Sequence, residues 1–197
     1  MSKTLKRLAN SLFLRNIQPY IPAKLEQPAK TLNINSAWKG HDLIIADIIE
    51  RFGLKTDKCL EFGVEFGYSA VTFSNYFKSV KGIDTFMGDI HTAHKGDHYD
   101  QTRASLAAYP NIELIRSDYR DWIAKDTDHY NLIHVDIVHT YEHTYACGLW
   151  SAQHSDCTIF HDTESFPDVK RAVHDIASKT GKTFYNYKPH YGLGIIV

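Results

Sequence analysis

The sequence predicts an α/β fold in which a doubly wound, mostly parallel β-sheet carries helices on both faces. From about residue 41 onward, short apolar runs alternate with segments of helical periodicity, which is typical of parallel strands joined by crossover helices. The chain has 197 residues, of which 43% are hydrophobic, so it can bury one substantial core. This composition excludes disordered, collagen-like and coiled-coil proteins.

The expected elements alternate regularly along the chain. Strands are expected at Lys58–Phe62, Val80–Asp84, Ile112–Arg116, Leu132–Asp136, Cys157–His161, Thr183–Tyr187 and Leu193–Val197. Helices are expected at Asp42–Phe52, Ser69–Phe77, Gln101–Tyr109, Tyr119–Ala124, Tyr141–His154 and Val169–Thr180. The short stretch with Pro189 and Gly192 between the last two strands leaves no room for a helix. We therefore expect strands with crossover connections, followed by a terminal antiparallel hairpin.

The first 36 residues are expected to form an N-terminal helix and connector, and residues 37–197 the main domain. Residues 1–30 are basic, with a single acid: Lys3, Lys6, Arg7, Arg15, Lys24 and Lys30 against Glu26. Helical spacing of apolar side chains predicts the helix: Leu5, Leu8, Leu12 and Phe13. The favoured interpretation is a helix packed on the domain or on a second subunit of a homo-oligomer. The alternatives are a lid over a site or a weak attachment to an anionic surface. Prolines predict a connector with little helix: Pro19, Pro22 and Pro28.

The overall charge argues against nucleic acid as a partner. Lys and Arg total 22 while Asp and Glu total 23, so a formal net charge of -1 offers no attraction for a polyanion. We expect a small-molecule or glycan substrate. The three cysteines form no Cys-x-x-Cys pair, which favours reduced, buried thiols in the cytoplasm. No apolar run approaches the roughly 20 residues that a membrane span needs, so we expect neither a span nor a cleaved signal.

A glycine-containing turn follows the first expected strand, where ligands bind in open sheets of this kind. The run Glu61–Ser69 has the pattern Glu-x-Gly-x-x-x-Gly-x-Ser, in which Gly63 and Gly67 permit a tight turn close to a ligand. Ser69 is placed to cap the next helix. A dinucleotide site has Gly-x-Gly-x-x-Gly, and Glu65 stands where its middle glycine would be. That carboxylate opposes a diphosphate and favours a cationic nucleoside cofactor.

Two further acids end the next two strands. Asp84 follows Gly63 by 21 residues, the usual distance for an acid that binds a ribose diol, although a turn role is the alternative. The third strand ends in Arg116-Ser117-Asp118. Asp118 either accepts a hydrogen bond from an adenine amino group or caps the helix that begins at Tyr119.

These motifs together resemble class I S-adenosylmethionine-dependent methyltransferases, and within them the branch of macrocin-type sugar O-methyltransferases. The resemblance covers residues 40–197 and rests on the runs 60–69, 82–89, 134–142, 160–163 and 192–194. It implies a Rossmann-like, seven-stranded sheet whose last strand is reversed. It also implies S-adenosylmethionine contacts from Glu61, Gly63, Gly67 and Ser69 near the methionine part, Asp84 at the ribose, and Ser117 and Asp118 at the adenine. Two positions depart from the family pattern: Glu65 replaces a common glycine, and Val138 stands where many relatives carry an acid.

The chemistry is expected at the ends of the fourth and fifth strands. Methyl transfer to a hydroxyl requires in-line alignment of the acceptor and removal of its proton, by a base or with the help of a metal. Asp136 and the pair His161-Asp162 end strands that are neighbours in the family, about 4.8 Å apart. They are candidate ligands of a divalent cation such as magnesium or manganese, although the imidazole suits manganese, iron or zinc better. The alternative is that the carboxylates position the substrate without a metal.

Histidines near these strands supply the remaining candidates. His139 is our first choice as general base, acting with Asp136, because a neutral imidazole is available near pH 7. His143 is expected to pack one turn further along. The histidine-containing loop between Gly88 and Tyr99 has irregular spacing for a zinc site, so we expect it to face the substrate. It contains His91, His94 and His98.

The sequence thus predicts an O-methyltransferase that moves a methyl group from S-adenosylmethionine to a sugar or glycoconjugate hydroxyl. Two other functions stay open. A metal-dependent hydrolase on a similar sheet would use the same histidines and acids, but it leaves the glycine turn unexplained. A catalytically inactive nucleoside-binding subunit would bind the cofactor without turnover.

Overall fold

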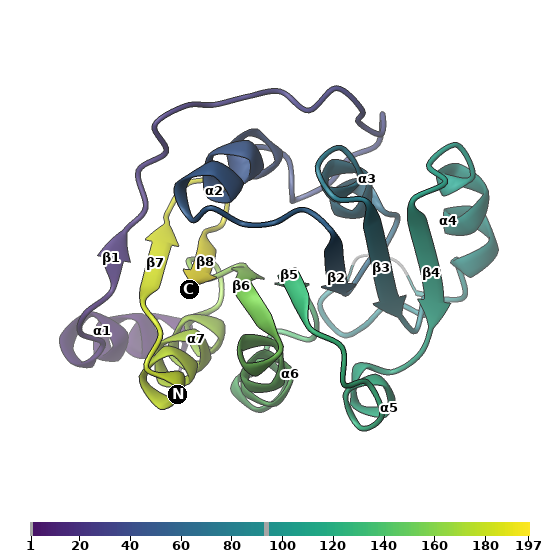
Figure 1. Cartoon of the computed structure of the whole chain (residues 1–197). Helices are drawn as coiled ribbons and strands as arrows, with labels where there is room; N and C mark the ends of the chain where they lie inside the picture. The colour runs from purple at the N-terminus through teal and green to yellow at the C-terminus, as the bar shows by residue number, and fades with distance from the viewer. Residues whose placement is uncertain (1, 93–94) are drawn as a thin grey trace.

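The computed structural model describes residues 2–92 and 95–197, which form one twisted sheet with helices on both faces (Figure 1). The strands are β1 (Gln18–Pro19), β2 (Lys58–Phe62), β3 (Ser79–Asp84), β4 (Ile112–Arg116), β5 (Tyr130–Val135), β6 (Ser155–His161), β7 (Phe184–Tyr187) and β8 (Leu193–Ile196). The helices are α1 (Lys3–Phe13), the short 3-10 helix Asp42–Ile44, α2 (Ile45–Arg51), α3 (Tyr68–Ser74), α4 (Tyr99–Leu106), α5 (Tyr119–Ile123), α6 (Tyr141–Gln153) and α7 (Pro167–Thr180). The expected α/β class and the order of elements are confirmed.

The strands run in the order β1-β7-β8-β6-β5-β2-β3-β4. All pairs are parallel except that β8 runs antiparallel to both β6 and β7, which confirms the terminal hairpin. The expected number of seven strands is wrong by one, because the connector adds a short edge strand. Gln18 and Pro19 pair with Tyr185 and Asn186 of β7. An edge strand tolerates proline because one side of its backbone needs no partner.

The inner strands β2, β5, β6 and β8 are buried on both faces, as expected for a sheet between helices, whereas the edge strands β1 and β4 are more exposed. Leu132 and Ile133 are adjacent in β5 and both fully buried, yet they belong to different core clusters. One cluster packs under α2 and α3, and the other under α6 and α7 (Figure 1). Cysteines lie in these clusters as buried, free thiols: Cys59, Cys147 and Cys157. Within the described ranges, no helix has the length and apolar character that crossing a membrane requires.

The turn after β2 differs from the expectation in one detail. Gly67, with a left-handed φ of 87°, is the residue that precedes α3, so Ser69 lies inside the helix and does not cap it. A Cβ at position 67 would lie 2.7 Å from a methyl carbon of Leu106. Glycine therefore allows both the backbone conformation and the close packing of α3 against α4.

The N-terminal helix packs on the domain, but through the opposite face from the one that its pattern suggests. Lys6 pairs with Asp168, and Asn10 Nδ2 donates to Pro167 O at 2.8 Å. The apolar stripe faces outward instead, with Leu8 57% and Phe13 76% exposed. Polar contacts with the start of α7 thus hold α1 in place.

Candidate active site

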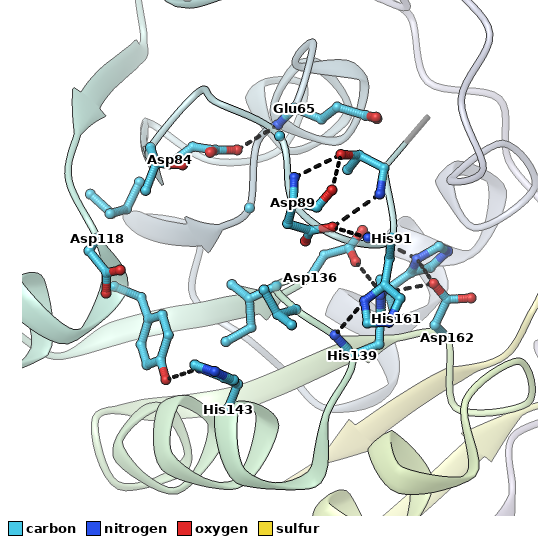
Figure 2. A pocket seen from close by; sticks show the side chains of 18 of the residues that line it. Glu65, Asp84, Asp89, His91, Asp118, Asp136, His139, His143, His161 and Asp162 are labelled. Carbon is cyan, nitrogen blue, oxygen red and sulfur yellow. Dashed lines mark hydrogen bonds and ion pairs between the residues drawn. The ribbon is translucent and has the colours of Figure 1, made fainter. Parts of the chain in front are cut away.

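A cavity of about 360 Å³ opens at the carboxyl ends of the central strands (Figure 2). It lies where parallel strands of an open sheet place their ligands. The residues predicted from the sequence that line it are Gly63, Asp84, Ser117, Asp118, Asp136, His139, His161 and Asp162. Glu61, Gly67 and Ser69 do not line it; Ser69 borders a smaller neighbouring cavity of about 40 Å³.

Gly63 allows the turn after β2 to lie against the end of β5. Its φ is 87°, and a Cβ built there would overlap the backbone carbonyl oxygen of Asp136. Asp136 N in turn donates to Phe62 O at 2.8 Å. The glycine is therefore required by backbone packing as well as by access to a ligand.

Asp84 organises the turn that it faces (Figure 2). Its Oδ2 accepts from the backbone N–H groups of Val64 at 2.8 Å and Glu65 at 2.9 Å. Its Oδ1 accepts from Phe86 N at 2.7 Å. Asp84 therefore has the structural role in a turn that the sequence analysis gave as the alternative. Its carboxylate also lines the cavity.

Asp118 likewise has a structural role at the cavity wall. It caps α5 by accepting from Arg120 N at 2.8 Å, and it pairs with the Arg120 guanidinium, whose hydrogen bonds hold the pKa of the carboxyl below its usual value. Arg120 itself lines the cavity, which the sequence did not indicate. Tyr119 OH and His143 Nδ1, 2.8 Å apart, line it too, so His143 is more than a packing residue.

Glu61 is buried beneath the site. It is fully inaccessible and lies 2.9 Å from His134 Nδ1, while Trp38 Nε1 donates to His134 Nε2 at 3.0 Å. Because Nε2 accepts, the proton of a neutral His134 sits on Nδ1 and is donated to Glu61. Burial raises the pKa of Glu61. These hydrogen bonds connect the segment around Trp38 to β2 and β5. Sequence spacing does not reveal this contact.

Two acids and two histidines converge at the ends of β5 and β6. Donor atoms of Asp136, His139, His161 and Asp162 all lie within 4.8 Å of one another. His139 Nε2 is 3.2 Å from Asp136 Oδ1 and 3.0 Å from Asp162 Oδ2. His161 Nδ1 is 3.2 Å from Asp136 Oδ2 and 3.3 Å from Asp162 Oδ2. The convergence expected for three of these residues is therefore present, and His139 joins them. We refer to these four residues as the Asp/His cluster.

The charges in this cluster are strongly coupled. Burial alone would lower the pKa of each histidine, but the two carboxylates outweigh it and raise the pKa of His139 to about 9 and of His161 to about 10. Burial likewise opposes ionisation of Asp136 and Asp162, yet the imidazoles hold both carboxyl pKa values below the usual range. The raised pKa of His139 disfavours the neutral imidazole that the sequence predicts near pH 7, because the two carboxylates stabilise its protonated form.

The cluster also fits a divalent cation. Although its Nδ1 lies close to two carboxylates, His161 makes no hydrogen bond of acceptable geometry with them, and His139 Nδ1 has no hydrogen-bond partner among the residues that the structure describes. A buried ring nitrogen without a hydrogen bond, as in His161, is explained by an ion that it binds. Two carboxylates and two imidazoles are a donor set for manganese, iron or zinc rather than for magnesium. The fourth donor is His139, which follows Asp136 by three residues. This Asp-x-x-His spacing was the signal in the sequence that could have identified it.

The loop after β3 closes one side of the cavity, as expected for a substrate-facing segment (Figure 2). His91 lies against His139, whose backbone N–H donates to His91 Nδ1 at 3.3 Å. Phe166 stacks on the His139 ring at 4.3 Å between centroids, and Lys3 of α1 lies 4.2 Å above the Phe166 ring. His94 lies outside the described residues. In the part of the loop that is described, no metal-ligand cluster forms.

A family model described as a methyltransferase domain matches residues 60–163, more than half of the chain. No curated protein matches significantly.

Solved structures share the fold at low sequence identity. Aeropyrum pernix fibrillarin, solved with bound S-adenosylmethionine, is 12% identical and matches with a TM-score of 0.58 over 89% of this chain and 88% of its own. A Bacillus cereus O-methyltransferase in complex with S-adenosylhomocysteine is 12% identical, with a TM-score of 0.57 over 98% and 87%. CalS10, an amino pentose methyltransferase from Micromonospora echinaspora solved with S-adenosylmethionine, is 11% identical, with a TM-score of 0.60 over 82% and 92%. The chain belongs to the methyltransferase-domain family and is a class I S-adenosylmethionine-dependent methyltransferase.

Proposed function

We propose that this enzyme methylates a hydroxyl group of a sugar or glycoconjugate, with a divalent cation assisting. The observation that supports the proposal is the position of the Asp/His cluster, which shares one cavity with the glycine turn and the acids that follow β3 and β4. The activity named for CalS10, on an amino pentose, is consistent with a sugar acceptor.

The cofactor is proposed to lie along the carboxyl ends of β2, β3 and β4. Its methionine part would lie at the turn of Gly63 and Gly67, above the buried Glu61 and beside Ser69. Asp84 would accept from the ribose hydroxyls, and Ser117 with Asp118 would face the adenine. The formally charged side chains of the lining are mainly acidic, with Arg120 as the basic one, which favours a sulfonium cation over a diphosphate. The acids are Glu65, Asp84, Asp89, Asp118, Asp136 and Asp162.

A cation in the cluster would be held by Asp136, His161 and Asp162. When bound, it would polarise the acceptor hydroxyl and lower its pKa. Asp136 and Asp162 orient His139 through its Nε2, which leaves Nδ1 facing away from these carboxylates. Nδ1 would take the proton of the acceptor hydroxyl once a bound cation neutralised the charge of the two carboxylates. Phe166, stacked on the imidazole, restricts its rotation. Asp136 thus orients the base and positions the acceptor.

Titration calorimetry tests the cofactor, and an acceptor screen tests the reaction. S-adenosylmethionine and S-adenosylhomocysteine should bind, whereas NADH should not. Methyl transfer to a panel of sugars and nucleotide-linked sugars should then follow. Binding without turnover on any hydroxyl acceptor would instead support the inactive nucleoside-binding subunit, and absence of binding by either methionine cofactor would reject the assignment.

Asp84→Ala should weaken S-adenosylhomocysteine binding by at least about tenfold. The substitution removes a ribose acceptor and releases three backbone N–H groups, two in the turn after β2 and one at Phe86, each hydrogen bond contributing on the order of 1 kcal/mol. Asp84→Asn keeps one acceptor oxygen and should lose less. Calorimetry on both variants measures the difference, and an unchanged affinity in Asp84→Ala would remove Asp84 from the cofactor site.

Metal-free protein should gain thermal stability on addition of manganese or zinc. An ion that binds only the folded state at about 100 times its Kd stabilises by about 2.7 kcal/mol, which raises Tm by several degrees. Asp162→Asn should abolish the gain, while Asp89→Asn, an acid of the same cavity outside the cluster, should retain it. If neither ion shifts the Tm of the unaltered protein, the carboxylates act without a metal.

A further inference from the structure

A second cavity, of about 550 Å³, lies between the N-terminal helix and the body of the protein. Its walls come from α1, the segment that leads to β1, the start of α7 and the end of β7 (Figure 1). It shares no lining residue with the candidate active site. The volume is within the range of small-molecule sites, about 300–1,000 Å³.

The charged side chains of this cavity are mainly basic. Arg7, Lys170 and Lys188 line it, and Glu164 is the acid among its lining residues. Glu164 is already engaged, because its Oε1 accepts from Lys170 and, at 2.7 Å, from Asn186 Nδ2. Lys188 is exposed and forms no ion pair or hydrogen bond within the described part of the chain. The cavity therefore has uncompensated positive charge.

The floor of the cavity is polar and fixed. Thr163 and Asn186 are 1% and 3% exposed, and Thr163 Oγ1 donates to Asn186 Oδ1 at 2.7 Å. Leu14 and Ile17 add an apolar side. Buried polar groups with fixed partners, beside an apolar wall, match a ligand that carries both hydroxyl groups and C–H faces.

We infer that this cavity is a second ligand site, which binds a small anionic molecule with a polar, sugar-sized body. A phosphate or carboxylate group would interact with Arg7 of α1 and Lys188, which follows β7, because both line the cavity and neither has an acidic partner among the described residues. Arg7 uses its Nη2 for the backbone oxygens of Glu164 and Ser165, at 3.1 and 3.4 Å, which leaves other guanidinium N–H groups for the anion.

The site adjoins the turn that carries Asp162. Thr163 and Glu164 follow Asp162 directly, and Phe166 N donates to Asp162 O at 3.0 Å. A ligand here contacts that turn without entering the cofactor cavity. Its binding should therefore be independent of S-adenosylhomocysteine, so it can be tested whether or not the proposed methylation is correct.

Calorimetric titration of the full chain with ribose 5-phosphate, at low ionic strength, tests the site. One molecule should bind per chain, ribose should not bind, and inorganic phosphate should compete. Lys188→Glu should weaken binding by about tenfold or more because it places a negative charge beside the anion. Lys179→Glu, an exposed lysine of α7 outside the cavity, should leave the affinity unchanged.

Three results would overturn the inference. They are no saturable binding at millimolar ribose 5-phosphate, equal losses in Lys188→Glu and Lys179→Glu, and displacement of the sugar phosphate by S-adenosylhomocysteine. The last result would place the probe in the catalytic cavity. Circular dichroism on both variants establishes that each is folded, so a loss confined to Lys188→Glu reports the cavity itself.

Discussion

Gly63→Ala is expected to destabilise the protein by about 4 kcal/mol or more, the range of severe core substitutions. Its Cβ would overlap the carbonyl oxygen of Asp136, which is backbone and cannot rotate away. The φ of 87° adds about 1–2 kcal/mol for any residue with a Cβ. Because β2 and β5 would have to separate at the cavity, cofactor binding should fall with stability. Urea denaturation followed by circular dichroism measures the loss.

Gly53→Ala is the matched control. Gly53 also has a left-handed φ, 60°, but a Cβ there would meet nothing within 4 Å. Gly53→Ala should therefore destabilise the protein only through the unfavourable backbone conformation, by about 1–2 kcal/mol. Equal losses at the two glycines would show that contact with Asp136 is not the reason for glycine at position 63.

Asp136→Asn is expected to lower methyl-transfer turnover by about a thousandfold, because it removes one cluster carboxylate while keeping the side-chain shape. Affinity for S-adenosylhomocysteine should stay within about twofold. In the metal-free variant, the pKa of His161 should fall, because Asp136 is the main attractive charge that opposes the effect of burial on this imidazole. Proton NMR of the histidine ring signals follows that titration.

Asp100→Asn is the control for this experiment, since Asp100 is an exposed acid of α4 outside the cavity. It should retain most of the turnover. Loss of cofactor binding in Asp136→Asn would assign Asp136 to the cofactor rather than to the reaction. More than a tenth of normal turnover would exclude it from both proton removal and acceptor positioning.

The elements of the sheet were predictable because their signal is local. Apolar runs of strand length and helical periodicity follow from residues that are adjacent in the chain, and β2 and β4 match their expected ranges from end to end. The ligand edge was predictable for the same reason: a residue that ends one parallel strand lies near the residue that ends its neighbour. Asp136 and the His161-Asp162 pair thus reach the same cavity.

Features that depend on distant partners were not predictable. The exposed stripe of α1 results from contacts of Lys6 and Asn10 with α7, about 160 residues away. β1 exists only because β7 offers it an edge. Nothing in the spacing of these residues reports such contacts.

The sequence by itself determined the fold class, the reversed last strand, the glycine turn and the acids at the strand ends, because period and position along a strand settle where each side chain points. Only the tertiary structure decided the chemical state of the site. The pKa of His139 is raised because two carboxylates from different strands surround it in a buried setting, and the buried Glu61 is bound by His134, which in turn accepts a hydrogen bond from Trp38. The charge state and the burial of a side chain depend on all of its neighbours in space, and only folding brings those neighbours together.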